Sequence, residues 1–187
     1  MKKIVIMSVA ALALAACSHG TKKVGETAPL ETKAEKVAQK RGEHVVSKIT
    51  FDKGNANLNS GARGELNKAV SQARQMGEID EVTVAVWSDM EYPARKDAKL
   101  PKKQVDLADS RGDKIEDFLA KDLDVSSYRV RVHNMGAKPN FLSEYFNTAD
   151  AELKNELTAM GIAPADGRGN VVTGQAGKAL VFIKLKE

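Results

Sequence analysis

Apolar residues recur along residues 45–187 with two different periods. Four short segments are rich in β-branched residues or alternate apolar with polar residues, as strands do: 45–51 (VVSKITF), 81–87 (EVTVAVW), 128–134 (YRVRVHN) and 178–185 (KALVFIKL). Between them, apolar residues recur every three or four positions, which is typical of amphipathic helices. The chain therefore alternates strands with helices.

Three helices are predicted by this spacing. The first has Ser60 as a possible N-cap and Gly77 as its stop, and the third follows Thr148 with acidic residues in its first turn. Their apolar stripes are Ala62, Leu66, Ala69, Ala73 and Met76; then Leu107, Ala108, Ile115, Phe118 and Leu119; then Leu153, Leu157 and Met160. Residues 163–177, with four glycines, are expected to be loop. The pattern indicates a two-layer α/β (α+β) domain in the order β-α-β-α-β-α-β.

The strand at 128–134 also predicts how the sheet is covered. Val130 and Val132 alternate with Arg129, Arg131 and His133, so one face of the sheet should meet helices while the other is partly solvated. With Lys48, these outward residues form either a basic face that attracts polyanions or an ordinary solvated face. The solvated face is the stronger interpretation, because polar-out alternation predicts it.

The first sixteen residues read as a targeting signal. A basic start (Lys2, Lys3) precedes an apolar run of about 13 residues, which is too short for a membrane span of roughly 20. Residues 14–17 (LAAC) resemble the lipobox of bacterial lipoproteins. The resemblance implies cleavage after Ala16 and lipidation of Cys17, and Ser18 in place of aspartate implies the outer membrane. The alternative is a secreted protein with an unpaired cysteine.

Residues 17–44 are expected to form a lipid-anchored flexible tether, leaving residues 45–187 as the domain. Leu30, Ala34, Val37 and Arg41 form only a thin helical stripe in that tether.

Composition excludes several classes of protein. With 187 residues, the chain has room for one domain and a tail. Its formal charge of +4 includes Lys2 and Lys3; without residues 1–16, 27 basic residues face 25 acidic ones, a charge of +2. That charge gives no reason to expect nucleic-acid binding. One cysteine excludes a disulfide framework. No metal-ligand spacing joins His19, His44 and His133, and no catalytic arrangement is recognisable, so neither a metal site, a cofactor nor an enzyme is predicted.

Short motifs in the domain resemble those of the OmpA-like family. They are Phe51-Asp52 with Ala56-x-Leu58, Ser88-Asp89 after the second strand, Leu107-Ala-Asp-Ser-Arg111, Met135-Gly136 with Pro139, and Asn147-Thr148. The resemblance implies a mixed four-stranded sheet with helices on one face. It also implies a periplasmic module that binds peptidoglycan noncovalently through diaminopimelate.

The resemblance places a candidate ligand site at Ser88, Asp89, Gln104 and Arg111. Diaminopimelate carries an ammonium, which suits a carboxylate such as Asp89, and a carboxylate, which suits the guanidinium fork of Arg111. Gln104 would bind a backbone or amide group of the ligand. The alternative is structural: Arg111 lies beside the apolar stripe of its helix, where it could extend along the surface or pair with Asp89.

The chain also departs from the family pattern. Val86 stands in place of a glycine and Trp87 in place of an aromatic or histidine neighbour, while Gln104 replaces asparagine and Asn134 a glycine. Lys178-Ala179-Leu180 lies where the family has an arginine pair, and the segment between Asp89 and Leu107 is about seven residues longer than usual. A second hypothesis follows, in which the domain is a scaffold that has lost its ligand and binds an envelope protein through residues 90–103.

Overall fold

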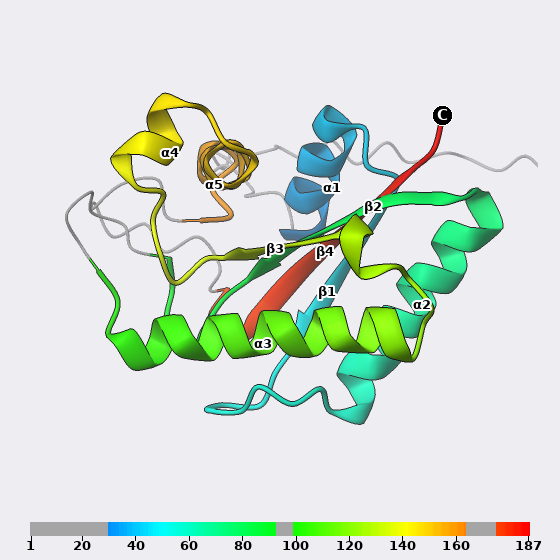
Figure 1. Ribbon diagram of the computed structural model, residues 1–187, viewed down its shortest axis with the longest axis horizontal. Coiled ribbons are helices and arrows are strands. Elements are labelled where there is room, and N and C mark those ends of the chain that lie inside the picture. Colours follow the sequence, from blue (N-terminus) through cyan, green and yellow to red (C-terminus); the bar gives the residue numbers. More distant parts are fainter. Residues whose placement is uncertain (1–29, 93–98, 164–174) are drawn as a thin grey trace, which may run out of the picture.

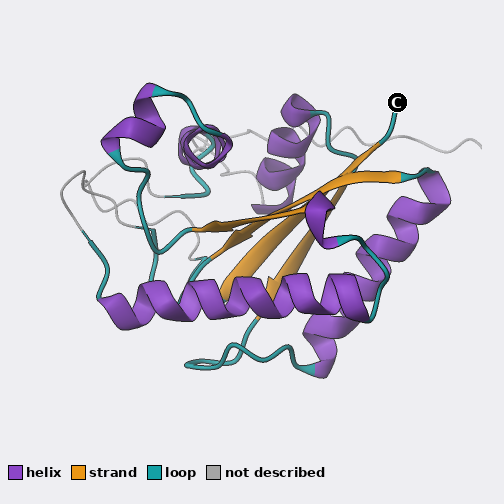
Figure 2. Ribbon diagram, in the orientation of Figure 1, coloured by secondary structure: helices purple, strands orange, loops and turns teal. Residues whose placement is uncertain are grey.

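The computed structural model describes residues 30–92, 99–163 and 175–187. Figures 1 and 2 show a central sheet with helices above and below it. The strands are β1 (Val45–Thr50), β2 (Ile79–Val86), β3 (Val130–Asn134) and β4 (Lys178–Leu185). The helices are α1 (Leu30–Arg41), α2 (Ser60–Met76), α3 (Lys102–Lys121), α4 (Phe141–Tyr145) and α5 (Ala149–Ala159), with a 3₁₀ turn at Ser127–Arg129.

The four strands form one mixed sheet in the order β1-β4-β2-β3. β4 is antiparallel to both of its neighbours, and β2 is parallel to β3. β1, β2 and β3 therefore run in the same direction, with β4 reversed. The predicted α/β class, element order and mixed four-stranded sheet are confirmed.

Helices α2 and α3 cover one face of the sheet. Alternate strand residues, among them Ile49, Val84 and Val181, are buried against Leu66 of α2 and Ile115 of α3. The predicted helix spacing is confirmed for most of both stripes, because Ala62 to Ala73 of α2 and Ala108 to Leu119 of α3 are buried at stripe spacing. Met76 is an exception: it was expected in the first stripe but is 54% exposed at the end of α2.

Two details fix these helices on the sheet. Asn59, not Ser60, caps α2: its side-chain oxygen accepts a hydrogen bond from the amide of Ala62 at 2.8 Å, and Ser60 is the first helical residue. Gly112 brings α3 against β3, since a Cβ at that position would lie 2.4 Å from Cγ1 of Val132.

The expectation of helices on one face only is wrong. Helices α1 and α5 lie on the opposite face (Figure 1) and bury the other set of alternating strand residues, including Ala85, Trp87, Leu180 and Phe182. The physical reason is visible in the sequence: β4 contains five consecutive apolar residues at 179–183, as strands buried on both faces do. The clean alternation at 128–134 comes from β3, which lies at the edge of the sheet.

His133 is a second correction on this face. It was expected to point outward, but only 7% of the residue is exposed, because α5 lies over it and Asp150 pairs with its ring at 3.1 Å. Arg129 and Arg131 are paired with Glu78 and Glu81. These contacts do not support the basic face considered above.

The predicted domain boundary at residue 45 is also wrong. Residues 30–41 form α1, and Ala34, Val37 and Ala38 are at most 3% exposed. Their apolar stripe is narrow, but it packs together with the apolar side chains of α5 against the same face of the sheet. Two ion pairs, from Lys40 and Arg41 to Glu156, join the end of α1 to α5.

The signal peptide, Cys17 and the tether up to residue 29 lie outside the described residues, as do residues 93–98 of the long loop and 164–174 of the glycine-rich segment. Those parts of the sequence interpretation stay predictions. In the described part of the chain, no helix combines the length and apolarity needed to cross a membrane.

Candidate functional site

Three loops meet at one end of the sheet, where β1, β2 and β3 finish. Because these three strands run in the same direction, the segments after Thr50, Val86 and Asn134 all leave the sheet at this end, and β4 begins there. The carboxyl ends of strands in α/β sheets are the usual position for ligand-binding groups. The candidate site predicted from the sequence lies at this end of the sheet.

Arg111, on α3, joins two of these loops, the one after β1 and the one after β2. Its side chain is completely buried, and it donates to the carbonyl oxygens of Asn55 (2.9 Å), Trp87 (2.9 Å) and Asp52 (3.2 Å). Nη2 also donates to Oδ1 of Asp89 at 2.6 Å. The guanidinium lies over the ring of Phe51, 4.9 Å from its centroid. These contacts hold the loop after β1 against the end of β2.

Asp89 is the more accessible member of the pair. Its side chain is 15% exposed, and its second oxygen, Oδ2, accepts from the amide of Gly54 at 2.6 Å. Gly54 has φ +70°, which a residue with a side chain rarely adopts, so the turn that presents this amide favours glycine. Burial opposes ionisation of Asp89, but the hydrogen bonds from Arg111 and Gly54 and the positive charges of Arg111 and Lys53 outweigh it, so its pKa lies below the usual value. Asp89 is therefore an anion at neutral pH.

Gln104 and Ser88 lie beside this pair in different roles. Oε1 of Gln104 accepts from the amide of Asp89 at 3.1 Å, which links the start of α3 to the end of β2. Ser88 is fully buried, and its hydroxyl exchanges hydrogen bonds with the backbone of Met90. The structure thus brings all four predicted site residues together, with Asp89 and Gln104 at the accessible side and Ser88 and Arg111 beneath.

The positions that depart from the family pattern are structural. Val86, Trp87, Ala179 and Leu180 are each at most 1% exposed and lie in the two cores. Asn134 bridges elements: its amide nitrogen donates to Val105 O and Asp109, and its oxygen accepts from the amide of Gly136.

Sequence reasoning missed the contribution of the loop after β1. The backbone of Asp52, Gly54 and Asn55 supplies three of the groups that hold Arg111 and Asp89. Phe51-Asp52 was recognised as a motif, but backbone donors and acceptors leave no side-chain signature. Only the phenylalanine, whose ring lies under the guanidinium, could have suggested the contact.

A second buried polar cluster lies on the α5 face. Lys154 is 4% exposed and donates to Asp150 at 2.9 Å, while His133 contacts the other oxygen of that carboxylate. Burial lowers the pKa of Lys154 against the opposing effect of Asp150. The cluster fastens α5 to β3. Among the residues that the structure describes, no group of three or more His, Cys, Asp or Glu could hold a metal ion.

Comparisons with known proteins give distant structural likenesses. No protein-family model and no curated protein matches the sequence. The OmpA-like domain of FopA1 from Francisella tularensis subsp. tularensis SCHU S4 aligns with a TM-score of 0.41 and 10% identity, over 76% of this chain and 75% of that chain. The peptidoglycan-associated lipoprotein from Burkholderia pseudomallei aligns with a TM-score of 0.41 and 8% identity, over 74% of this chain and 90% of that chain. At this distance the likenesses decide nothing about the site or its ligand.

Proposed function

We propose that this protein is a cell-wall-binding module of the OmpA-like type, which binds peptidoglycan noncovalently at Asp89. The observation that carries the proposal is the Asp89–Arg111 pair, in which Nη2 of Arg111 lies 2.6 Å from Oδ1 of Asp89 at the end of the sheet where three loops meet. The sequence motifs at residues 51–58, 88–89 and 107–111 support the family assignment.

The chemistry of the site suits an ammonium better than a carboxylate. Asp89 is ionised, and a carboxylate has about four positions that accept hydrogen bonds. Arg111 and Gly54 each occupy one, which leaves room for the ammonium of diaminopimelate. The amide of Gln104 adjoins Asp89 and is assigned the backbone or amide group of the ligand.

Arg111 has a different role in this proposal from the one expected from the sequence. Four of its hydrogen bonds go to the protein itself, and the side chain is completely buried. Its fork is therefore not free to clamp a ligand carboxylate in this arrangement. Arg111 positions Asp89 and keeps it ionised, and Ser88 supports the turn beneath it.

Sedimentation with purified peptidoglycan sacculi tests the proposal. The chain from residue 18 to 187 should sediment with the sacculi, and Asp89→Asn should weaken binding about tenfold or more, because the carboxylate charge is lost while the side chain keeps its shape. Asp117→Asn is the matched control: that carboxylate is also paired, with Lys121, but lies near the far end of α3. Thermal unfolding of each variant shows whether the domain stays folded. Equal sedimentation of folded Asp89→Asn and wild type would disprove the site.

Membrane attachment is proposed through lipidated Cys17. The signal pattern at residues 1–16 and the lipobox resemblance support an outer-membrane lipoprotein whose domain faces the periplasm. In a Gram-negative host, the wild-type protein should incorporate labelled palmitate and fractionate with outer membranes, and Cys17→Ser should do neither. Release of the wild type in soluble form would contradict the anchor.

A protein-binding scaffold is the second candidate function. It is favoured by Ala179 and Leu180, which are buried core residues where the resembled family carries an arginine pair. The segment 90–103 is then the expected contact. Crosslinking from this segment to an envelope protein, without sedimentation on sacculi, would favour the scaffold; sedimentation that survives deletion of the segment would oppose it.

A further inference from the structure

The head of diaminopimelate carries two opposite charges on one carbon, an ammonium and a carboxylate. Asp89 suits the ammonium, but the carboxylate calls for a cation close to Asp89. Arg111 does not supply that cation, because four hydrogen bonds to the protein itself occupy its buried guanidinium. Recognition of the whole head therefore requires another basic side chain beside Asp89.

Lys53 lies beside Asp89 in the turn that follows β1. A hydrogen bond from the amide of Asn55 to the carbonyl of Asp52, at 3.1 Å, closes this turn. Lys53 and Gly54 are its two central residues, and the amide of Gly54 donates to Oδ2 of Asp89 at 2.6 Å. Lys53 is thus bonded directly to the residue that contacts the carboxylate, and the two Cα atoms are about 3.8 Å apart.

The side chain of Lys53 is available to a ligand. The residue is exposed, and among the residues that the structure describes it makes no hydrogen bond or ion pair. Burial opposes the ionisation of Asp89, but the hydrogen bonds already described and the charges of Arg111 and Lys53 together hold its pKa below the usual value. Asp52, the acid of the same turn, accepts instead from the side chain of Asn59 at 3.3 Å.

The lysines at the start of α3 are less well placed. Lys102 donates to both carboxylate oxygens of Asp106 at 2.8 Å. Lys103 precedes Gln104, and successive side chains of a helix point about 100° apart. Gln104 itself bonds to the backbone amide of Asp89 and not to its carboxylate. Lys53, by contrast, adjoins the group that contacts the carboxylate.

The local charges favour a ligand head that is neutral overall. An ammonium alone would meet the positive charges of Arg111 and Lys53 together with the negative charge of Asp89. A head that also carries a carboxylate can pair that group with Lys53, which turns a repulsion into an attraction.

We propose that Lys53 binds the carboxylate of the diaminopimelate head while Asp89 binds its ammonium. This assignment rests on the peptidoglycan-binding function proposed above, and it makes Lys53 a specificity-determining residue. Lysine is diaminopimelate without that carboxylate. A wall peptide with lysine in place of diaminopimelate offers the same ammonium and should bind more weakly.

Two tripeptides that differ in this carboxylate test the assignment. They are alanyl-γ-glutamyl-diaminopimelate and alanyl-γ-glutamyl-lysine, and titration calorimetry measures the dissociation constant of each with chain 18–187. The wild type should bind the diaminopimelate form about threefold to tenfold more tightly, the range expected for one partly exposed charge pair. Lys53→Met, which keeps most of the side-chain length but loses the charge, should bind the two forms within about twofold of each other. Lys53→Arg should restore the preference.

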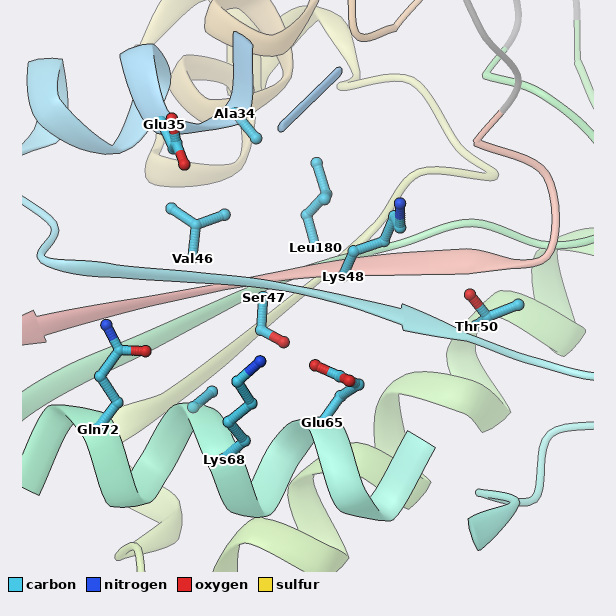
Figure 3. Close-up of a pocket in the computed structure, with 11 residues that line it drawn as sticks. Ala34, Glu35, Val46, Ser47, Lys48, Thr50, Glu65, Lys68, Gln72 and Leu180 are labelled. Carbon is cyan, nitrogen blue, oxygen red and sulfur yellow. The ribbon is translucent and has the colours of Figure 1, made fainter. Parts of the chain in front are cut away.

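Lys68 provides the matched control. It is an exposed lysine of α2 that lines a groove of about 530 Å³ along the outer strand β1 (Figure 3), outside the loops that form the site. Lys68→Met should keep the preference of the wild type. Asp89→Asn should weaken the binding of both tripeptides, because both carry the ammonium.

The outcomes separate this assignment from the function on which it rests. An unchanged preference in Lys53→Met would overturn it, as would a preference that disappears in Lys103→Met, or in Arg95→Met combined with Lys96→Met from the segment outside the described residues, but survives in Lys53→Met. Sedimentation of the wild type with sacculi, without a preference between the tripeptides, would overturn the role of Lys53 alone. Absence of both sedimentation and tripeptide binding would overturn the proposed function as well.

Discussion

Replacing Arg111 with methionine is expected to destabilise the domain severely, although the residue was first considered as a ligand-binding group. Methionine keeps the aliphatic part of the side chain and removes every hydrogen bond. The carbonyls of Asp52, Asn55 and Trp87 lose their donor, and Asp89 loses its cation.

The size of the effect follows from burial. Removing one partner of a buried ion pair costs about 3–5 kcal/mol, and each buried polar group left unpaired costs roughly 1–3 kcal/mol. Asp89 is 15% exposed, and water can replace part of what it loses, so the lower end applies: about 3 kcal/mol. Domains of this size have a total stability of only about 5–15 kcal/mol. The urea midpoint should fall by about 1–2 M.

Urea unfolding at pH 7 measures this change, with Arg63→Met as the control. Arg63 also lies on a helix and over an aromatic ring, that of Phe118, but it is exposed, so its loss should cost less than about 1 kcal/mol. A double-mutant cycle sharpens the test. Asp89→Asn should destabilise the wild type, yet be neutral or stabilising beside Arg111→Met, because it then removes an uncompensated carboxylate.

The reasoning is refuted if Arg111→Met costs less than 1 kcal/mol, or if Asp89→Asn has the same effect in both backgrounds. Either result would mean that the guanidinium does not hold the loops together in solution. If the methionine variant does not fold, Arg111→Lys, which keeps the charge but cannot make all four hydrogen bonds to the two loops, should lie between it and the wild type.

Three further changes test other parts of the structure. Gly112→Ala should cost about 1–3 kcal/mol despite its higher helix propensity, because the new methyl group meets Val132 at 2.4 Å, and Val132→Ala should recover part of the loss in urea unfolding. Val37→Asp should lower the free energy of unfolding by about 2–4 kcal/mol, since residue 37 is 1% exposed. An unchanged melting temperature would mean that α1 does not pack on the sheet and that residues 17–44 form a flexible tether, as the sequence suggested. The pKa of Asp89 is lowered from 3.8 in the folded state, so its ionisation stabilises the fold fully above that pH. The stability difference between wild type and Asp89→Asn should therefore be constant above about pH 4 and shrink as the pH falls further; a difference that widens in acid would contradict the shift.

Much of the fold could be predicted because periodicity is a local property. The strand at 178–185 and the apolar stripe around Leu66 carry their own signal, and both elements form where they were expected. Two expectations were wrong for the same reason: that His133 points outward and that residues 30–41 belong to a flexible tether. Both the burial of His133 and the packing of α1 depend on a second layer of helices, which cannot be predicted from the pattern of any single segment. A thin stripe such as Ala34 and Val37 is too weak to predict packing, and becomes buried only when α5 lies beside it.

The candidate site shows the same division between local and tertiary information. The resemblance to the OmpA-like family predicted that Asp89 and Arg111 lie together, with Gln104 and Ser88 nearby, and the structure brings these residues together. The structure decided which of them faces outward. Three backbone carbonyls, from two loops far apart in the sequence, converge on the guanidinium of Arg111, which is completely buried, whereas the side chain of Asp89 is 15% exposed.

The sequence by itself thus determined the order of strands and helices and carries the pattern of a targeting signal, since both are written in neighbouring residues, whereas the charged pair was predicted from a family resemblance. Only the tertiary structure decided that both faces of the sheet are covered, that α1 packs in the core, that Arg111 bonds to the backbone of the protein itself and that β1 is an outer strand beside a groove. Those features depend on contacts between segments distant in the chain, and the backbone carbonyls that hold Arg111 are present at nearly every position of a sequence.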